Sequence, residues 1–447
     1  MALSGRLVLV AALGALVVGL LSPAPAGVAG IAAALLVGVV VDLVAAGSVR
    51  ALRLQRREIE PVRLGESVEA TLVVENPGRR RVRGQLRDAW APSAGVAPAR
   101  HRLDLPAGER RRLVATLTPT RRGERTAERV TVRSWGPLGL AARQGSTTVP
   151  GALRVLPPFT SRRHLASRLA RLRELDGRRA VQVRGAGTEF DSLREYVPGD
   201  DVRSLDWRAS ARSPELVVRT WRPERDRHLL LVLDTGRTAA ARVGSGPSPG
   251  SAAGRDPGDE GDGLPRLDAA LDAALLLGAL ASRGGDRVDL LAVDRAVRAQ
   301  VVGARDLLPA LVSALAPLEA ALVETDMRLL ASSVLARAPR RSLVVLFTAL
   351  DDAAVREGLE PVLGALLRRH VVLVAAVDDP SLSAMAGARD DADAVYAAAA
   401  AQVALDARRT TAERLARRGV EVVSAEPDAF APAVADRYLA LKAAGRL

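Results

Sequence analysis

Two continuous apolar runs dominate the first fifty residues. Uncharged, mostly apolar residues extend from Leu7 to Leu21, and a second run from Gly27 to Gly47 carries Asp42 as its only charge. A helix needs about 20 apolar residues to cross a bilayer, so the second run is long enough and the first is marginal. A Ser-Pro-Ala-Pro-Ala turn at 22–26 separates them. The pattern predicts two transmembrane helices, a hairpin over residues 1–50.

Arginine flanks the predicted hairpin on both sides, while its turn is uncharged. Arg6 precedes it, and Arg50 begins a group of four arginines that follows it. The positive-inside rule then places both ends, and the bulk of the chain, in the cytoplasm of a multi-pass cell-membrane protein. An alternative treats residues 1–26 as a cleaved signal peptide ending in Ala-Pro-Ala, with the second run as a single span. Both alternatives leave the residues after Arg50 inside the cell.

Residues 57–157 change to an alternating pattern. Apolar and polar positions alternate from Ser67 to Val74, and the run stops at a turn-forming Asn76-Pro77-Gly78. Further alternating segments around Leu113–Leu117 and Val130–Ser134 are separated by Gly-containing turns. Short strands at this spacing predict an all-β, immunoglobulin-like sandwich without catalytic groups.

Residues 227–447 alternate short Val- and Leu-rich runs with helical patterns. The expected strands are Leu229–Leu233, Val288–Val293, Val297–Val302, Leu343–Phe347, Val371–Val377 and Val420–Val423. The expected helices are Leu267–Ala281, Arg305–Leu318, Met327–Ala336, Ala353–Arg369 and Ala394–Arg418. Continuous apolar strands alternating with helices predict a doubly wound α/β domain with a largely parallel sheet. A Gly/Pro/Ser-rich stretch at 243–265 indicates a flexible insertion in this domain.

Composition narrows the classes of function. The chain of 447 residues has no Cys, which excludes disulfides and thiol chemistry, and its formal net charge is +13. The positive charge is spread along the chain without interleaved aromatics, so we expect no nucleic-acid partner. The high arginine content has two alternative explanations, which are codon bias and attraction to anionic lipid. The Gly246–Gly250 segment matches a G-x-S-x-G pattern, but it lacks the strand–turn–helix context of a nucleophile.

Residues 158–226 connect the two predicted domains and contain the densest signal. A basic helical pattern at 161–184 places Leu165, Leu169 and Leu172 on one face, for packing on neighbours or for the membrane surface. Four of the eleven aromatic residues then fall between 187 and 221, among closely spaced arginines and carboxylates. Such a segment forms an ion-pair network that docks it on a neighbouring domain, a surface for a partner, or a catalytic carboxylate pair. No nucleophile–base arrangement accompanies it, which disfavours the third.

This segment resembles the signature of the domain-of-unknown-function 58 family. The residues that carry the resemblance are Glu189, Phe190, Arg194, Tyr196, Gly199, Asp200, Arg203, Asp206, Trp207 and Arg212. The similarity continues to the ending Tyr438-Leu-Ala-Leu-Lys442. The resemblance implies a membrane protein with no established catalytic activity, often encoded beside a MoxR-type AAA+ ATPase that we expect to be its partner.

The last domain is similar to the von Willebrand factor A fold. That fold holds a metal with Asp-x-Ser-x-Ser after its first strand, a Thr on a later loop and an Asp after its fourth strand. Asp234, Thr238 and Thr325 match three of these positions, whereas Gly236 and Ala349 replace a Ser and an Asp. The resemblance therefore implies a degenerate site for which Mg²⁺ is an option. Asp351 and Asp352 are the candidates to replace the Asp that Ala349 lacks, but their spacing from the strand differs from that of the motif.

These observations lead to one expectation and two alternatives. We expect a non-enzymatic scaffold or adaptor, anchored in the lipid bilayer, whose strand ends face a protein partner such as the implied AAA+ ATPase. The first alternative is a divalent-metal-dependent module or enzyme built on Asp234, Thr238 and Thr325. The second is an extracellular binding or adhesion protein, which would require the opposite topology.

Overall fold

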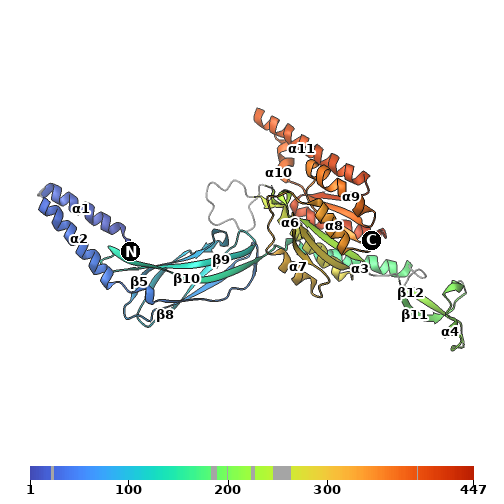
Figure 1. Ribbon diagram of the computed structural model, residues 1–447, viewed down its shortest axis with the longest axis horizontal. Coiled ribbons are helices and arrows are strands. Elements are labelled where there is room, and N and C mark those ends of the chain that lie inside the picture. Colours follow the sequence, from blue (N-terminus) through green and yellow to red (C-terminus); the bar gives the residue numbers. More distant parts are fainter. Residues whose placement is uncertain (22–24, 183–188, 199, 223–226, 245–262, 390) are drawn as a thin grey trace. The chain divides into compact units, whose positions relative to one another are not determined.

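The computed structural model describes residues 1–447 except 22–24, 183–188, 199, 223–226, 245–262 and 390 (Figure 1). The chain separates into two compact units that meet in sequence at Leu156 and Pro157, and each unit is described by itself.

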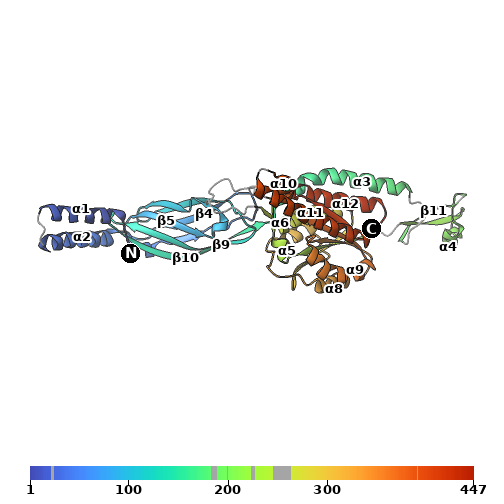
Figure 2. The same ribbon diagram turned by 90° about the horizontal axis from the view of Figure 1, so that it is seen from above.

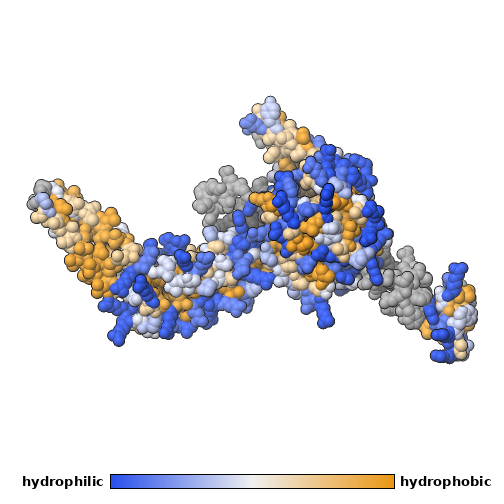
Figure 3. All heavy atoms as spheres, in the orientation of Figure 1, coloured by the Kyte–Doolittle hydropathy of each residue, from blue (hydrophilic) through white to orange (hydrophobic). Residues whose placement is uncertain are grey.

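The N-terminal unit begins with the two apolar helices α1 (Gly5–Leu21) and α2 (Pro25–Ala45). Their large apolar side chains, including Leu9, Leu36 and Val37, are exposed, and Figure 3 shows this end as a hydrophobic surface. Among the described residues, Pro25–Ala51 is the one helical stretch long and apolar enough to cross a membrane, and Gly5–Leu20 is a shorter apolar helix. One candidate span is therefore established by length and composition.

Asp42, the single charge of α2, is completely buried and joins the helix to a β-turn. Its carboxylate accepts hydrogen bonds from the backbone N–H groups of Leu138 (2.7 Å), Leu140 (2.5 Å) and Ala141 (3.0 Å). A side chain at Gly136 would overlap Asp42, so a glycine is required at this approach. The helix end and the turn 136–140 consequently behave as one rigid junction.

We expect Asp42→Ala to destabilise this junction, because it leaves three backbone donors without their acceptor. The loss should be on the order of 3 kcal/mol, with Asp42→Asn intermediate since one acceptor oxygen remains. Limited proteolysis of the full chain in detergent would report opening of the turn, and Val41→Ala on the same helix is the matched control. Equal protection of the turn in Asp42→Ala and Val41→Ala would contradict the role of the carboxylate.

Two β-sheets make up the rest of this unit. The strands are β1 (Ala2–Leu3), β2 (Arg53–Arg56), β3 (Val62–Arg63), β4 (Val68–Glu75), β5 (Val82–Trp90), β6 (Val96–Ala97), β7 (Arg100–Leu105), β8 (Arg110–Leu117), β9 (Gly123–Trp135) and β10 (Ala141–Leu156). One sheet has the order β1-β10-β9-β5-β7, with β3 added in parallel to β10, and the other has the order β2-β4-β8-β6. The predicted alternating strands are confirmed.

The core of the unit lies between these two sheets. Leu72 and Leu113 of one sheet pack with Leu86 and Val132 of the other, as the period-two pattern requires. The buried Arg56–Asp88 ion pair (2.7 Å) lies beside this core, with the Arg56 guanidinium 4.8 Å from the Trp90 ring centre.

The second unit is built on a six-stranded sheet of order β17-β16-β13-β18-β19-β20. The strands are β13 (His228–Asp234), β16 (Arg287–Val293), β17 (Val297–Val301), β18 (Leu343–Phe347), β19 (Val371–Val377) and β20 (Glu421–Ala425), and a short ribbon pairs β14 (Arg242–Val243) with β15 (Leu264–Pro265). All neighbouring pairs of the six are parallel except β16 and β17. The predicted largely parallel sheet is confirmed.

Helices cover both faces of this sheet (Figure 2). They are α5 (Arg237–Ala240), α6 (Arg266–Arg283), α7 (Leu307–Leu315), α8 (Met327–Arg337), α9 (Glu360–Leu367), α10 (Pro380–Gly387), α11 (Ala392–Arg417) and α12 (Pro427–Ala443). Leu330 of α8 and Leu363 of α9 pack on one face, whereas Phe430 of α12 contacts Phe347 of β18 on the other. Before α9 the predicted helix Ala353–Arg369 contains a π-helical turn, Ala354–Leu359.

The basic helix α3 (Leu165–Gln182), preceded by a short 3-10 turn at Thr160–His164, packs within the second unit. Leu165 and Leu172 are buried, and Arg168 forms an ion pair with Asp436 of α12 at 2.8 Å. Of the two alternatives for this helix, packing on neighbours is therefore the observed one for its described side chains.

Lys442, the last residue of the similarity ending, is buried in an ion pair. Its ammonium donates to Asp286 Oδ1 at 2.9 Å, and the Tyr438 hydroxyl donates to Asp286 Oδ2 at 2.5 Å. The pair fastens α12 to the turn before β16. A buried pair of this kind keeps the two elements in place, because separating or removing either charge leaves the other buried without compensation.

Replacing Lys442 by Met should destabilise the second unit by about 3 to 5 kcal/mol, because the Asp286 charge stays buried and unpaired. The double variant Lys442→Met/Asp286→Asn removes both charges and should recover part of that loss. Urea unfolding followed by near-ultraviolet circular dichroism measures both. A double variant no more stable than Lys442→Met alone would show that the charge pair is not the cause.

Candidate functional site

Asp234 ends β13 at the carboxyl edge of the parallel sheet. The chain leaves β13 for β16 on one side and later enters β18 on the other, so the order reverses between β13 and β18. Ligands of open α/β sheets bind outside the strand ends at such a reversal. Asp234 and Thr348, which follows β18 directly, both lie at this point. The sheet topology thus selects this edge as the candidate site.

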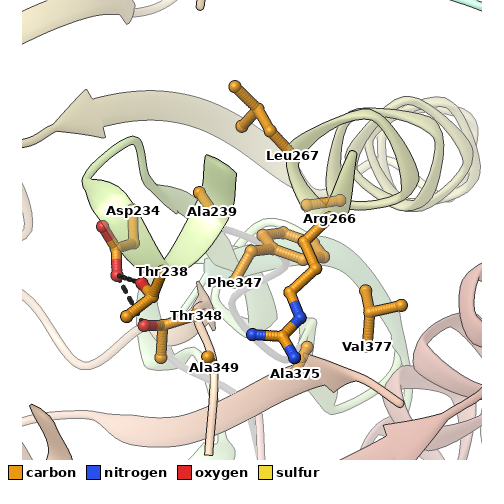
Figure 4. A pocket seen from close by; sticks show the side chains of 11 residues that line it. Asp234, Thr238, Ala239, Arg266, Leu267, Phe347, Thr348, Ala349, Ala375 and Val377 are labelled. Carbon is orange, nitrogen blue, oxygen red and sulfur yellow. Dashed lines mark hydrogen bonds between the residues drawn. The ribbon is translucent and has the colours of Figure 1, made fainter. Parts of the chain in front are cut away.

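The Asp234 carboxylate is 3% exposed and accepts hydrogen bonds from four neutral donors. Oδ1 accepts from the Gly236 N–H at 2.9 Å and from the Thr325 hydroxyl, and Oδ2 accepts from the Thr238 and Thr348 hydroxyls at 3.1 and 2.6 Å. Figure 4 shows the last two bonds. A carboxylate has about four acceptor positions, so all of them are used.

Backbone hydrogen bonds position the loop that carries Thr325. Ala321 N–H donates to the carbonyl of Thr235, and Arg237 N–H donates to that of Val323, both at 2.8 Å. Asp326 then caps α8 by accepting from two N–H groups of its first turn. The three predicted residues Asp234, Thr238 and Thr325 are therefore together, although 91 positions separate the first from the last.

Thr348 is the residue of this cluster that the sequence interpretation missed. The comparison of positions pointed instead to Ala349, which is buried, and to Asp351 and Asp352. Asp351 caps the following helical turn, while Asp352 pairs with Arg414 at 2.6 Å, so neither carboxylate bonds to Asp234. The sequence did contain a signal for Thr348. This hydroxyl residue directly follows a buried parallel strand, so it lies at the same sheet edge as Asp234.

Gly236 leaves the space that the Thr325 hydroxyl occupies. A β-carbon at position 236 would overlap that hydroxyl and would lie 2.8 Å from the carbonyl oxygen of Val323. A Ser at position 236, as in the metal motif, would therefore displace the Thr325 hydroxyl that donates to Asp234.

These donors suit Mg²⁺ poorly. Magnesium requires near-octahedral oxygen ligands, usually with more than one carboxylate or phosphate. Within the hydrogen-bonded cluster, Asp234 is the one carboxylate and its acceptor positions are filled, and the described residues contain no group of three His, Asp or Glu placed to hold a metal. The cluster instead links three chain segments through one buried charge.

An open pocket of about 280 Å³ borders the cluster on one side. It is lined by Asp234, Arg237, Thr238, Glu324, Thr325, Met327, Ala353, Ala354, Glu357 and Gly358. Arg237 and Glu324 form an exposed ion pair of 2.5 Å. The π-helical turn contributes Glu357 and Gly358, and such turns frequently occur at functional sites.

A much smaller pocket of about 20 Å³ borders the other side of Asp234 and contains Arg266 (Figure 4). Burial lowers the pKa of the Arg266 guanidinium, and the nearby Arg408 acts in the same direction. The buried Nε of Arg266 has no hydrogen-bond partner. The volume of this small pocket accommodates roughly one water molecule rather than a substrate.

The charged segment of the predicted signature forms a separate small module. It consists of β11 (Glu189–Glu195), the 3-10 turn Val202–Ser204, α4 (Trp207–Ser210) and β12 (Val217–Arg222), and the two strands pair antiparallel. Glu189 and Phe190 take part in this pairing through their backbones, and their side chains and Gly199 lie outside the described residues. Tyr196 donates its N–H to the carbonyl of Leu216.

Two carboxylates of this module are satisfied internally. The hydrogen bond from Arg194, at 2.5 Å, and the Val197 N–H lower the pKa of Asp200. The N–H of Ala209 and the Arg219 guanidinium lower that of Asp206. Both ion pairs lie within the module rather than between the module and a neighbouring domain.

Other side chains of the module, both apolar and basic, are exposed. Trp207 is 66% exposed, although the chain has only four tryptophans. Arg203, Arg208 and Arg212 are exposed and form no ion pair with any described residue. Val218 is buried, whereas Leu193, Val197, Val202 and Leu216 are exposed. A two-stranded sheet with so small a core needs further contacts to be stable.

At the opposite, amino edge of the sheet, the fold brings together a Ser, a His and an Asp. His228 Nδ1 is 3.0 Å from Ser342 Oγ, and its Nε2 is 2.8 Å from Asp289 Oδ2. Sequence spacing gave no hint of this triple, since the histidines are scattered along the chain. Ser342 and Asp289 are buried, and Ser342 donates to the Arg340 carbonyl, so the triple acts as a structural network.

Comparison with known proteins gives a family match for a short part of the chain. Residues 192–253 match the model of the family described as "Protein of unknown function DUF58". The "Uncharacterized protein YeaD" of Bacillus subtilis (strain 168) is 27% identical over 113 residues, which cover 25% of this chain and 28% of that protein. The match thus spans less than a third of its length. The resemblance to DUF58 is confirmed for this part.

Solved structures resemble the chain only distantly. A PapD-like domain of human CEP192 is 14% identical and covers 24% of this chain and 84% of that domain, with a TM-score of 0.20. A protein of unknown function from Porphyromonas gingivalis W83 is 18% identical over 24% of this chain and 48% of its own, with a TM-score of 0.19. Scores this low assign no fold.

The predicted insertion at 243–265 lies largely outside the described residues, as does the Gly246–Gly250 pattern. Its ends are described, with Val243 paired to Leu264. The insertion therefore starts and finishes on one short antiparallel ribbon.

Gly236→Ser would restore the hydroxyl of the metal motif, yet we expect it to destabilise the second unit by about 1 to 3 kcal/mol, because the new side chain competes with Thr325 for space. Thermal unfolding in the presence and absence of 5 mM Mg²⁺, roughly a saturating amount, measures this. The control is Gly364→Ser, where a β-carbon meets nothing within 4 Å. An equally stable Gly236→Ser variant would refute the steric explanation.

Proposed function

We propose that this protein is a membrane-anchored scaffold or adaptor that binds a partner protein and has no catalytic activity of its own. The observation that carries the proposal is the exposed Trp207 in the DUF58-matching module, at 66%. Trp and Arg are the residues that most often dominate the binding energy of protein interfaces. Because the module buries little of its own apolar surface, a partner that covers it would also stabilise it.

The membrane anchor of this proposal is the apolar N-terminal hairpin, with α1 and α2 both crossing the bilayer. The arginines at both ends support a cytoplasmic position for the two sheets and the α/β unit. The two packed β-sheets, which lie between the hairpin and the α/β unit along the sequence, then serve as an immunoglobulin-like spacer. We assign the α/β unit to the von Willebrand factor A type, on the strength of its strand order and of Asp234, Thr238 and Thr325.

The partner in this proposal is a AAA+ ATPase of the MoxR type, which the family resemblance implies. A divalent-metal-dependent module is the second candidate, favoured by the meeting of Asp234, Thr238 and Thr325 at one strand edge. Isothermal calorimetry of the full chain with Mg²⁺ separates the two, because the adaptor proposal expects no heat of binding.

Co-purification of the tagged full chain from its own cell membranes tests the proposal. We expect a stoichiometric protein partner with the unmodified chain and a reduction of about tenfold or more with Trp207→Ala, as for a dominant interface residue. Tyr396→Ala is the matched control, because Tyr396 is 78% exposed on α11 and belongs to another surface. Failure to recover any stoichiometric protein from membranes would refute the adaptor function.

A further inference from the structure

The open pocket at the strand edge has an excess of negative charge in a strongly basic chain. The formal net charge of the protein is +13, yet three carboxylates and a single guanidinium line this pocket. Arg237 is neutralised by Glu324 at 2.5 Å, which leaves Asp234 and Glu357 uncompensated. No cation bonds to either carboxylate among the described residues.

Asp234 makes this excess significant because it is buried. A buried carboxylate is ordinarily paired with a cation, since its transfer from water is costly. Hydrogen bonds from neutral hydroxyls and an N–H group satisfy its oxygen atoms but leave its full negative charge in place. The pocket wall therefore carries a negative potential that a cation entering from solvent would reduce.

The hydroxyl groups determine the kind of cation. Thr238 and Thr325 both line the pocket and both donate their protons to Asp234. Each hydroxyl oxygen then offers only acceptor lone pairs to a ligand. The free Glu357 carboxylate on the π-helical turn is a further acceptor. A group with several N–H donors matches this lining, whereas Mg²⁺ finds too few ligands in octahedral positions.

Size and apolar lining favour a single long side chain. The volume of about 280 Å³ lies at the lower limit for pockets that hold small molecules. Met327, Ala353 and Ala354 provide an apolar wall for a methylene stem. Gly358 packs closely against Met327, with 3.1 Å between its would-be β-carbon and the Met327 Cγ, which keeps the wall smooth on that side.

We propose that this pocket receives the guanidinium or ammonium side chain of a partner protein, with Glu357, Thr238 and Thr325 as acceptors and Asp234 as the buried counter-charge. This proposal rests on the adaptor function and adds the chemistry of recognition at the strand edge: the partner presents an Arg or Lys on a protruding segment.

The test uses the full chain in detergent micelles and N-acetyl-arginine amide as the probe. Saturation-transfer nuclear magnetic resonance should show saturable binding of this probe and of N-acetyl-lysine amide. The neutral isostere N-acetyl-citrulline amide should bind at least about tenfold more weakly. Binding of citrulline amide equal to that of arginine amide, or no binding of either cation, would overturn the proposal. Competition by Mg²⁺ at or below 1 mM, roughly its cellular level, would show a metal site instead.

Variants locate the binding to this pocket. Glu357→Gln should weaken arginine amide binding about fivefold, and Ala354→Phe should abolish it by filling the pocket. Glu413→Gln on α11, an exposed carboxylate outside the pocket, should leave it unchanged. Circular dichroism verifies that each variant is folded, and an unaffected Glu357→Gln variant would refute the assignment.

Co-purification with Glu357→Gln separates failure of this inference from failure of the adaptor function. If the partner is retained by Glu357→Gln but lost with Trp207→Ala, the adaptor function stands and the pocket assignment is wrong. If no partner is recovered by the unmodified chain, the adaptor function is wrong, whatever the small probes do.

Discussion

The buried negative charge of Asp234 is the constraint on which the strand edge depends. Three threonine hydroxyls, from the segments after β13, before α8 and after β18, all converge on it. Removing this carboxylate would leave three segments without their common acceptor. The same carboxylate gives the edge its charge and lines the neighbouring pocket.

Aspartates play the same part elsewhere in the chain, where Asp42 and Asp286 are buried and Asp272 is half-buried. Asp42 holds a β-turn against α2, Asp286 holds α12 through Lys442 and Tyr438, and Asp272 of α6 accepts from Thr160 and Ser161. Burial raises the pKa of Asp272, and the hydrogen bonds from Thr160 and Ser161 oppose this rise. With aromatics only 2% of residues, small Leu, Val and Ala side chains fill the cores, and directed hydrogen bonds to carboxylates fix the junctions between elements.

The surfaces available to partners differ in character. The DUF58-matching module offers Trp207 and unpaired arginines, while the strand edge offers acceptors around an uncompensated charge. The adaptor function that we propose rests on the first of these surfaces, and the proposed recognition of a partner's Arg or Lys rests on the second.

The sequence by itself predicted most of the strands and helices of the second unit, although α10 and α12 were not among the expected helices. Leu343–Phe347 and Val371–Val377 were predicted to the residue, because continuous β-branched and Leu runs are specific to buried parallel strands. It also identified Asp234, Thr238 and Thr325 as candidates. Only the tertiary structure decided that Thr348 joins them, that Asp352 turns away to Arg414, and that His228 meets Ser342 and Asp289. The reason is physical: periodicity reports which face of an element is buried, whereas contacts between side chains distant in sequence depend on strand order and loop packing, which local patterns do not encode.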